Sequence, residues 1–189
     1  MKKIFFVFLL TLFVSQPCYA IVSHGINYPD TLKAGTRDIV FNGAGIRTKA
    51  FLEMYAAALY LTQKQSNYVK IIEADEPMAI RLNILSHLIN SKNFIENTSA
   101  GFERSTKGNT APIQTRIDMV CAVFKDQIRK GDVFDLIYVP GVGTAIYHNG
   151  KLKSTIEGLD LKKALFGIWI IDNPWHGCEP LRRGMLGLK

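Results

Sequence analysis

The sequence from Asp38 to Leu61 reads DIVFNGAGIRTKAFLEMYAAALYL, and it carries the strongest indication of the fold. β-Branched and aromatic residues dominate it, while Asn42 to Gly45 is rich in glycine. We interpret the stretch as β structure that a glycine-rich turn interrupts, with a last strand from Phe51 to Leu61. The alanines make this last segment ambiguous, but its aromatic residues and its lack of a helix cap favour a buried strand.

The remaining sequence adds strands and helices in separate groups. Residues 79–85 alternate apolar and polar side chains, which predicts a strand. Two helices are predicted next, from Ser91 to Arg104 and from Pro112 to Arg129, because a serine cap opens the first and apolar residues recur every three or four positions in the second. Later strands are predicted at 133–139, 144–147 and 152–156, and later helices at 159–170 and 180–186. This order predicts an α+β fold, an antiparallel sheet that helices cover on one face.

The first 20 residues have the pattern of a secretory signal peptide. Two lysines precede an apolar run from Ile4 to Val14, and the segment ends in Cys18-Tyr19-Ala20. The apolar run is too short to cross a bilayer, which takes about 20 helical residues, although an uncleaved anchor is the alternative. We predict cleavage after Ala20, a periplasmic or secreted location and no transmembrane segment after processing. Residues 21–189 then suit one domain.

Charge and histidine placement exclude two classes of partner. The chain has 23 basic and 16 acidic residues, and the basic residues are scattered instead of forming a stripe. We therefore expect no nucleic-acid partner. The histidines have no ligand spacing with each other or with cysteine, so no metal site is expected, and no cofactor.

Two cysteines, Cys121 and Cys178, remain after the predicted cleavage. In an oxidising compartment they are expected either to form one disulfide bond or to be two buried free thiols. Neither lies in an evident electropositive and exposed setting, so no catalytic thiol is expected.

Several segments resemble a known family. FNGAGIRTK at 41–49, followed by YAAALYL at 55–61, is similar to the N-terminal signature of the chalcone isomerase fold. YVPGVGT at 138–144 and ALFGIW at 164–169 resemble the later part of bacterial chalcone isomerase-like proteins. The resemblance covers most of residues 25–187. It implies an open-faced β-sandwich, with helices over one face of a large antiparallel sheet and a ligand cleft between them.

The resemblance also implies roles for two residues. The family arginine falls on Arg47; it helps to stabilise an oxyanion in plant isomerases and holds a carboxylate in the related fatty-acid-binding proteins. Tyr55 stands where true isomerases have threonine, and tyrosine there matches the fatty-acid-binding branch. Between Ser86 and Ser105 we find no match for the tyrosine and asparagine that isomerases use with their substrate, which argues against chalcone cyclisation.

The chemistry of these two residues is compatible with such a site. An arginine among apolar neighbours is costly to bury unless an acceptor satisfies it, and its planar fork suits a carboxylate. Arg47 and Tyr55 are eight residues apart, which places them on one face if the strand is unbroken. The alternatives are an ion pair of Arg47 with Glu53 or Glu103, and a core position for Tyr55.

We therefore expect a non-catalytic carrier of an acidic apolar ligand, such as a fatty acid, with Arg47 and Tyr55 at its head group. One alternative is an isomerase or lyase in which Arg47 stabilises an oxyanion. The other is an envelope interaction module without a small ligand. Core positions are expected for six further aromatic residues, some of which could line the cleft: Tyr60, Phe94, Phe102, Phe124, Phe166 and Trp169.

Overall fold

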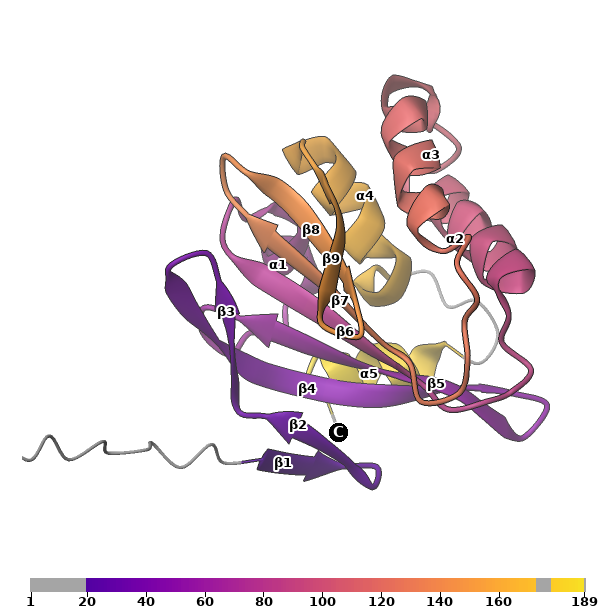
Figure 1. The fold of residues 1–189 in the computed structure, drawn as a ribbon. Coiled ribbons are helices and arrows are strands. Elements are labelled where there is room, and N and C mark those ends of the chain that lie inside the picture. Colours follow the sequence, from indigo (N-terminus) through magenta and orange to yellow (C-terminus); the bar gives the residue numbers. More distant parts are fainter. Residues whose placement is uncertain (1–19, 173–177, 189) are drawn as a thin grey trace, which may run out of the picture.

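The computed structural model describes residues 20–172 and 178–188, and a seven-stranded antiparallel sheet organises them (Figure 1). The strand order follows the chain, so each strand pairs with the one before it. Helical segments are inserted after the third, fourth and last strands of this sheet. The strands are β3 (Thr31–Ala34), β4 (Arg37–Lys49), β5 (Leu52–Leu61), β6 (Met78–Ile84), β7 (Val133–Val139), β8 (Gly143–His148) and β9 (Lys151–Ile156).

Helices cover one face of this sheet, as predicted (Figure 1). α2 packs against both α3 and α4, and α5 lies along β4. The helices are α1 (Tyr68–Glu73), α2 (Ser91–Ser105), α3 (Gln114–Val123), α4 (Leu159–Ile170) and α5 (Glu179–Met185), with a 3-10 turn at Ala111–Ile113. The main core lies between these helices and the sheet. All six aromatic residues predicted for the core are buried: Tyr60, Phe94, Phe102, Phe124, Phe166 and Trp169.

A second, smaller core lies on the opposite face of the sheet. A hairpin of β1 (Ala20–Ser23) and β2 (Ile26–Pro29) contributes Tyr28 to it. The Phe41 ring is tilted against Tyr28 and meets Tyr60 edge to face, with centroids 5.6 and 5.7 Å apart, and the Tyr60 hydroxyl donates to the Pro29 carbonyl at 3.0 Å. Successive residues of a strand face opposite sides, so Tyr60 enters this core while Leu59 and Leu61 enter the main one.

The glycine-rich segment is part of a strand, so the predicted turn at 42–45 is wrong. β4 runs unbroken through it, with a bulge between Phe41 and Gly43. A Cβ on Gly43 would lie 2.2 Å from the Gly184 carbonyl oxygen, and one on Gly45 would lie 2.5 Å from that of Leu181. The glycines are needed because the backbone of α5 packs directly on β4.

One predicted helix boundary is wrong, and one helix was missed. The helix predicted to reach Arg129 ends at Val123, yet Phe124 and Ile128 beyond it are still buried. Asp126 fixes the turn there: its carbonyl accepts from Ser91 and its carboxylate from Lys153. The six-residue helix α1 was not predicted, because it is short and its cap, Asn67, lies in a polar stretch.

The predicted signal peptide lies outside the described residues, except for Ala20, which begins β1. No helix within residues 20–172 and 178–188 is long and apolar enough to span a membrane.

Candidate functional site

Arg47 and Tyr55 are register partners on the neighbouring strands β4 and β5. The chain reverses between them at Ala50 and Phe51, so the argument from an unbroken strand does not apply. They nevertheless share a face of the sheet, because residues directly opposite each other in an antiparallel pair project to the same side. The predicted proximity is correct, and the hairpin is its reason.

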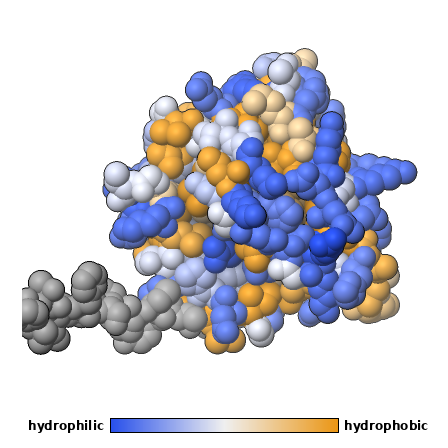
Figure 2. Space-filling view, viewed as in Figure 1, coloured by the Kyte–Doolittle hydropathy of each residue, from blue (hydrophilic) through white to orange (hydrophobic). Residues whose placement is uncertain are grey.

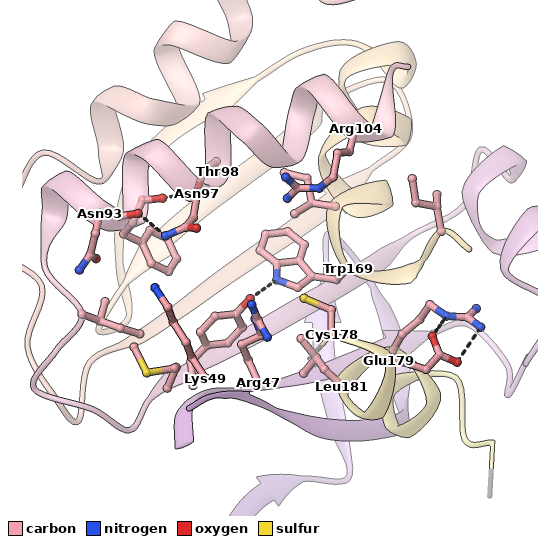
Figure 3. Close-up of a pocket in the computed structure, with 17 residues that line it drawn as sticks. Arg47, Lys49, Asn93, Asn97, Thr98, Arg104, Trp169, Cys178, Glu179 and Leu181 are labelled. Atoms are coloured by element: carbon pink, nitrogen blue, oxygen red, sulfur yellow. Dashed lines mark hydrogen bonds and ion pairs between the residues drawn. The ribbon is translucent and has the colours of Figure 1, made fainter. Parts of the chain in front are cut away.

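Both side chains border a pocket between the sheet and helices α2, α4 and α5 (Figure 3). The pocket encloses about 170 Å³. Much of its wall is apolar, from Met54 on β5, Ile89 before α2, Phe94 on α2, Ile168 and Trp169 on α4, and Leu181 on α5. Phe94 and Trp169 are thus both core residues and pocket residues.

The pocket has an excess of positive charge. Four basic side chains line it, Arg47, Lys49, Arg104 and Arg182, against one acidic residue among the described ones, Glu179. Glu179 accepts two hydrogen bonds from Arg182, at 2.9 and 3.1 Å, and these bonds hold the pKa of its carboxyl below the ordinary value. The local field therefore favours an anion.

The Arg47 guanidinium is nearly buried at the floor of this pocket, and its Nη1 donates to the Thr48 carbonyl at 2.7 Å. The two acids considered as its partners have other neighbours. Glu53 is exposed and pairs in register with Thr48, while the Glu103 carboxylate accepts from Thr110 at 3.4 Å.

The Tyr55 hydroxyl receives a hydrogen bond from Trp169 Nε1 at 3.2 Å (Figure 3). Burial raises the pKa of Tyr55 to about 12, with a further contribution from Cys178. At neutral pH Tyr55 is therefore a neutral phenol. Because the indole occupies an acceptor position of its oxygen, the hydroxyl proton is directed toward other acceptors.

The sequence prediction missed the polar residues that α2 contributes to the pocket. Asn93, Asn97 and Thr98 line it, together with Arg104 from the last turn of α2. Asn97 Nδ2 donates to the Asn93 carbonyl at 2.6 Å. The four-residue spacing of the two asparagines, beside the buried Phe94, was the available signal.

Cys121 and Cys178 are both free and both partly exposed, so the expectation of a disulfide or of two buried free thiols is wrong. Cys121 on α3 contacts Ser99, with 3.6 Å between sulfur and oxygen, whereas Cys178 lines the pocket just before α5. Burial raises the pKa of both thiols, which keeps them protonated at neutral pH. Across the described residues, histidine, cysteine and carboxylate side chains form no group of three suited to a metal ion.

Comparison with known proteins agrees with this architecture. A family model described as chalcone isomerase-like matches residues 20–187. The crystal structure of a fatty-acid binding protein from Arabidopsis thaliana aligns with a TM-score of 0.66 at 18% sequence identity, over 89% of this chain and 96% of that chain. At this identity the likeness establishes the fold alone. No curated protein matches the sequence.

Proposed function

Because the chain belongs to the chalcone isomerase-like family, we propose that its pocket binds an acidic apolar ligand, such as a fatty acid, which the protein carries without transforming. The observation that carries this proposal is the combination of an apolar wall with an excess of cationic side chains. A ligand with an anionic head and an apolar tail satisfies both. The aligned fatty-acid binding protein, which has the same fold, supports this choice of ligand.

The head group is assigned to the Arg47 and Tyr55 pair. A guanidinium offers a carboxylate charge-assisted hydrogen bonds, and the Tyr55 hydroxyl adds a neutral donor from the neighbouring strand. The pocket, at about 170 Å³, is smaller than the roughly 300–1,000 Å³ typical of drug-sized ligands. A long tail would therefore extend beyond the enclosed space.

The described pocket residues favour a carrier over an isomerase. Intramolecular addition requires a proton acceptor or donor with a pKa near the working pH. Burial raises the pKa of Tyr55 to about 12 and also raises that of the Cys178 thiol, and the Glu179 carboxylate is held by Arg182. Arg47 could stabilise an oxyanion, but none of these three groups is suited to form one at neutral pH.

We further propose that this carrier acts in the cell envelope, after removal of residues 1–20. The family match begins at residue 20, where the predicted signal ends. Intact-mass measurement of the protein from an envelope fraction should give the mass of residues 21–189. A mass that includes Met1 would contradict export with cleavage.

The test of ligand class is mass spectrometry of small molecules extracted from the purified, processed protein. We expect a long-chain acid from the wild type and its loss in Arg47→Ala. The matched control is Arg37→Ala, which removes an exposed arginine from the far end of the same strand. Recovery of no acid from the wild type, or of equal amounts from Arg47→Ala, would contradict the proposal.

A further inference from the structure

The tip of the β4–β5 hairpin presents apolar side chains to solvent. Phe51 is fully exposed at 103%, and Leu52 beside it is 52% exposed. Figure 2 shows apolar surface projecting at the edge of the molecule where Figure 1 places this tip. Large exposed apolar side chains that gather at one place mark interaction sites more often than isolated ones do.

A neighbouring loop extends this surface. Tyr55 pairs with Ile84, the last residue of β6, and the Met54 carbonyl accepts from Leu85 and Ser86 at 2.9 and 3.1 Å. The loop from β6 to α2 therefore leaves the sheet beside the hairpin, and it carries Leu88, which is 57% exposed. We call Phe51, Leu52 and Leu88 the apolar tip.

The backbone of the hairpin turn is unfavourable for the residues that occupy it. Ala50 has φ = 47° and Phe51 has φ = 66°, values at which two-residue turns usually place asparagine or glycine. A bulky residue in this region costs stability, and such strain is concentrated at functional positions. Because the Phe51 ring is fully exposed, packing within the chain does not explain its presence.

We propose that the apolar tip docks on a lipid bilayer surface that carries anionic head groups. Three side chains are far too few for a stable protein interface, which takes about 800 Å² from each partner. Membrane attachment needs only a small number of aromatic and aliphatic side chains together with nearby basic residues. Lys49 on the hairpin and Lys92 at the start of α2 are both exposed and supply that charge, which the exposed Glu53 only partly offsets.

Membrane docking goes beyond the proposed function, and it affects how a ligand would reach the pocket. Lys49 and Met54 of the hairpin and Ile89 of the loop also line the pocket. The apolar tip therefore borders the pocket, and docking brings that side of the pocket to the bilayer. An acidic apolar ligand could pass between membrane and pocket there without its tail crossing water.

The test is flotation of the processed protein with vesicles of phosphatidylcholine and phosphatidylglycerol at about 3:1 in low salt. We expect the wild type to float and the double variant Phe51→Ser/Leu52→Ser to bind about tenfold less. The matched control is Leu152→Ser, which should float like the wild type. This leucine is 55% exposed and lies on β9, an edge strand four positions from β5 in the sheet. A wild type that does not float, or a double variant that floats equally well, would overturn the proposal.

Two further measurements separate docking from other effects. Phe51→Gly relieves the backbone strain, so we expect it to melt at a higher temperature than the wild type while binding vesicles more weakly. Weaker binding to pure phosphatidylcholine is expected, and equal binding would contradict the anionic surface. The assay uses no fatty acid, so its failure would leave the ligand proposal standing, and failure of the ligand proposal would leave docking testable.

Discussion

Two cross-strand pairs of the sheet are built on an arginine, and they differ in what lies opposite the guanidinium. Arg81 on β6 pairs with Asp135 on β7 and donates to its carboxylate at 2.6 and 2.9 Å. Arg47 on β4 pairs with Tyr55 on β5, which is a neutral phenol at physiological pH. The same residue type in the same sheet thus faces a carboxylate in one place and a neutral donor in the other.

The two pairs also face opposite sides of the sheet. Arg81 pairs with Ala58 of the smaller core, on the face that β1 and β2 partly cover, whereas Arg47 points toward the pocket. The Arg81 pair neutralises itself inside the fold, and Arg47 instead contributes to the positive field of a cavity. We therefore propose that Arg81 serves stability, and this difference in position matches the ligand-binding role proposed for Arg47.

The largest expected effect on stability follows from breaking the internal pair. Arg81→Ala leaves the buried Asp135 carboxylate without its bidentate partner, so we expect the free energy of unfolding to fall by about 3 kcal/mol in urea titrations. The double variant Arg81→Met/Asp135→Leu removes both charges and should recover to within about 1 kcal/mol of the wild type. A loss below about 1 kcal/mol in the single variant would show that the pair is not structural.

A third buried cation, Lys162, extends the comparison to pH. Its Nζ donates to the carbonyls of Ile71, Ile72 and Ala74 at 3.1, 2.9 and 2.7 Å, and burial lowers its pKa from 10.5 to about 8. Between pH 8 and pH 10.5 the unfolded chain keeps the Lys162 proton and the folded chain does not. The contribution of Lys162 to the free energy of unfolding therefore increases as pH rises through this range, and this gain is lost as pH falls through 8.

We therefore expect the contribution of Lys162 to the free energy of unfolding to be about 1–2 kcal/mol more favourable at pH 9.5 than at pH 7. The measurement is the difference in unfolding free energy between the wild type and Lys162→Met at both pH values, because other titrating groups cancel in that difference. Lys153→Met, which removes a more exposed lysine paired with Asp126, is the control and should keep the wild-type dependence. A pH-independent difference would show that Lys162 stays charged in the fold.

The smallest effect concerns the neutral member of the pocket pair. Tyr55→Phe removes one hydroxyl donor and keeps the ring, so affinity for a fatty acid should fall by about 0.5–1.5 kcal/mol, or roughly two- to twelvefold, in calorimetric titrations. Trp169→Phe removes the bond that orients this hydroxyl, together with part of the apolar pocket wall. In a double-mutant cycle the Trp169 effect should therefore shrink once Tyr55 is phenylalanine, and strictly additive losses would contradict the orienting role.

The elements that could be predicted from sequence are those whose signal is local. The period-two alternation at 79–85 and the aromatic content of 51–61 predict strands, because each pattern depends only on which side chains of that same segment are buried. The reason for Gly43 is not local, since the atom that excludes a side chain there belongs to Gly184, far along the chain. Without knowledge that α5 packs on this strand, the glycine-rich segment is interpreted as a turn.

The site shows the same limit. Arg47 and Tyr55 could be proposed from one continuous motif and a resemblance, although the hairpin that places them face to face was not foreseen. Arg104, Asn97 and Cys178 come from α2 and from the residue before α5, and only the packing of those helices over the sheet brings them to the same cavity. The sequence motif therefore predicts only the residues of the β4–β5 hairpin, and the residues that the helices contribute are missed.

Under the proposed function, Arg47 holds an anionic head group while the fold stands without it. The most direct test of this role is titration of palmitate into the processed wild type and Arg47→Ala, with thermal melts alongside and Arg37→Ala as control. We predict that Arg47→Ala binds about 30- to several-thousand-fold more weakly, the equivalent of about 2–5 kcal/mol, while folding like the wild type. Palmitate binding as tight as that of the wild type would contradict the site, and failure of Arg47→Ala to fold would show instead that Arg47 is a structural residue.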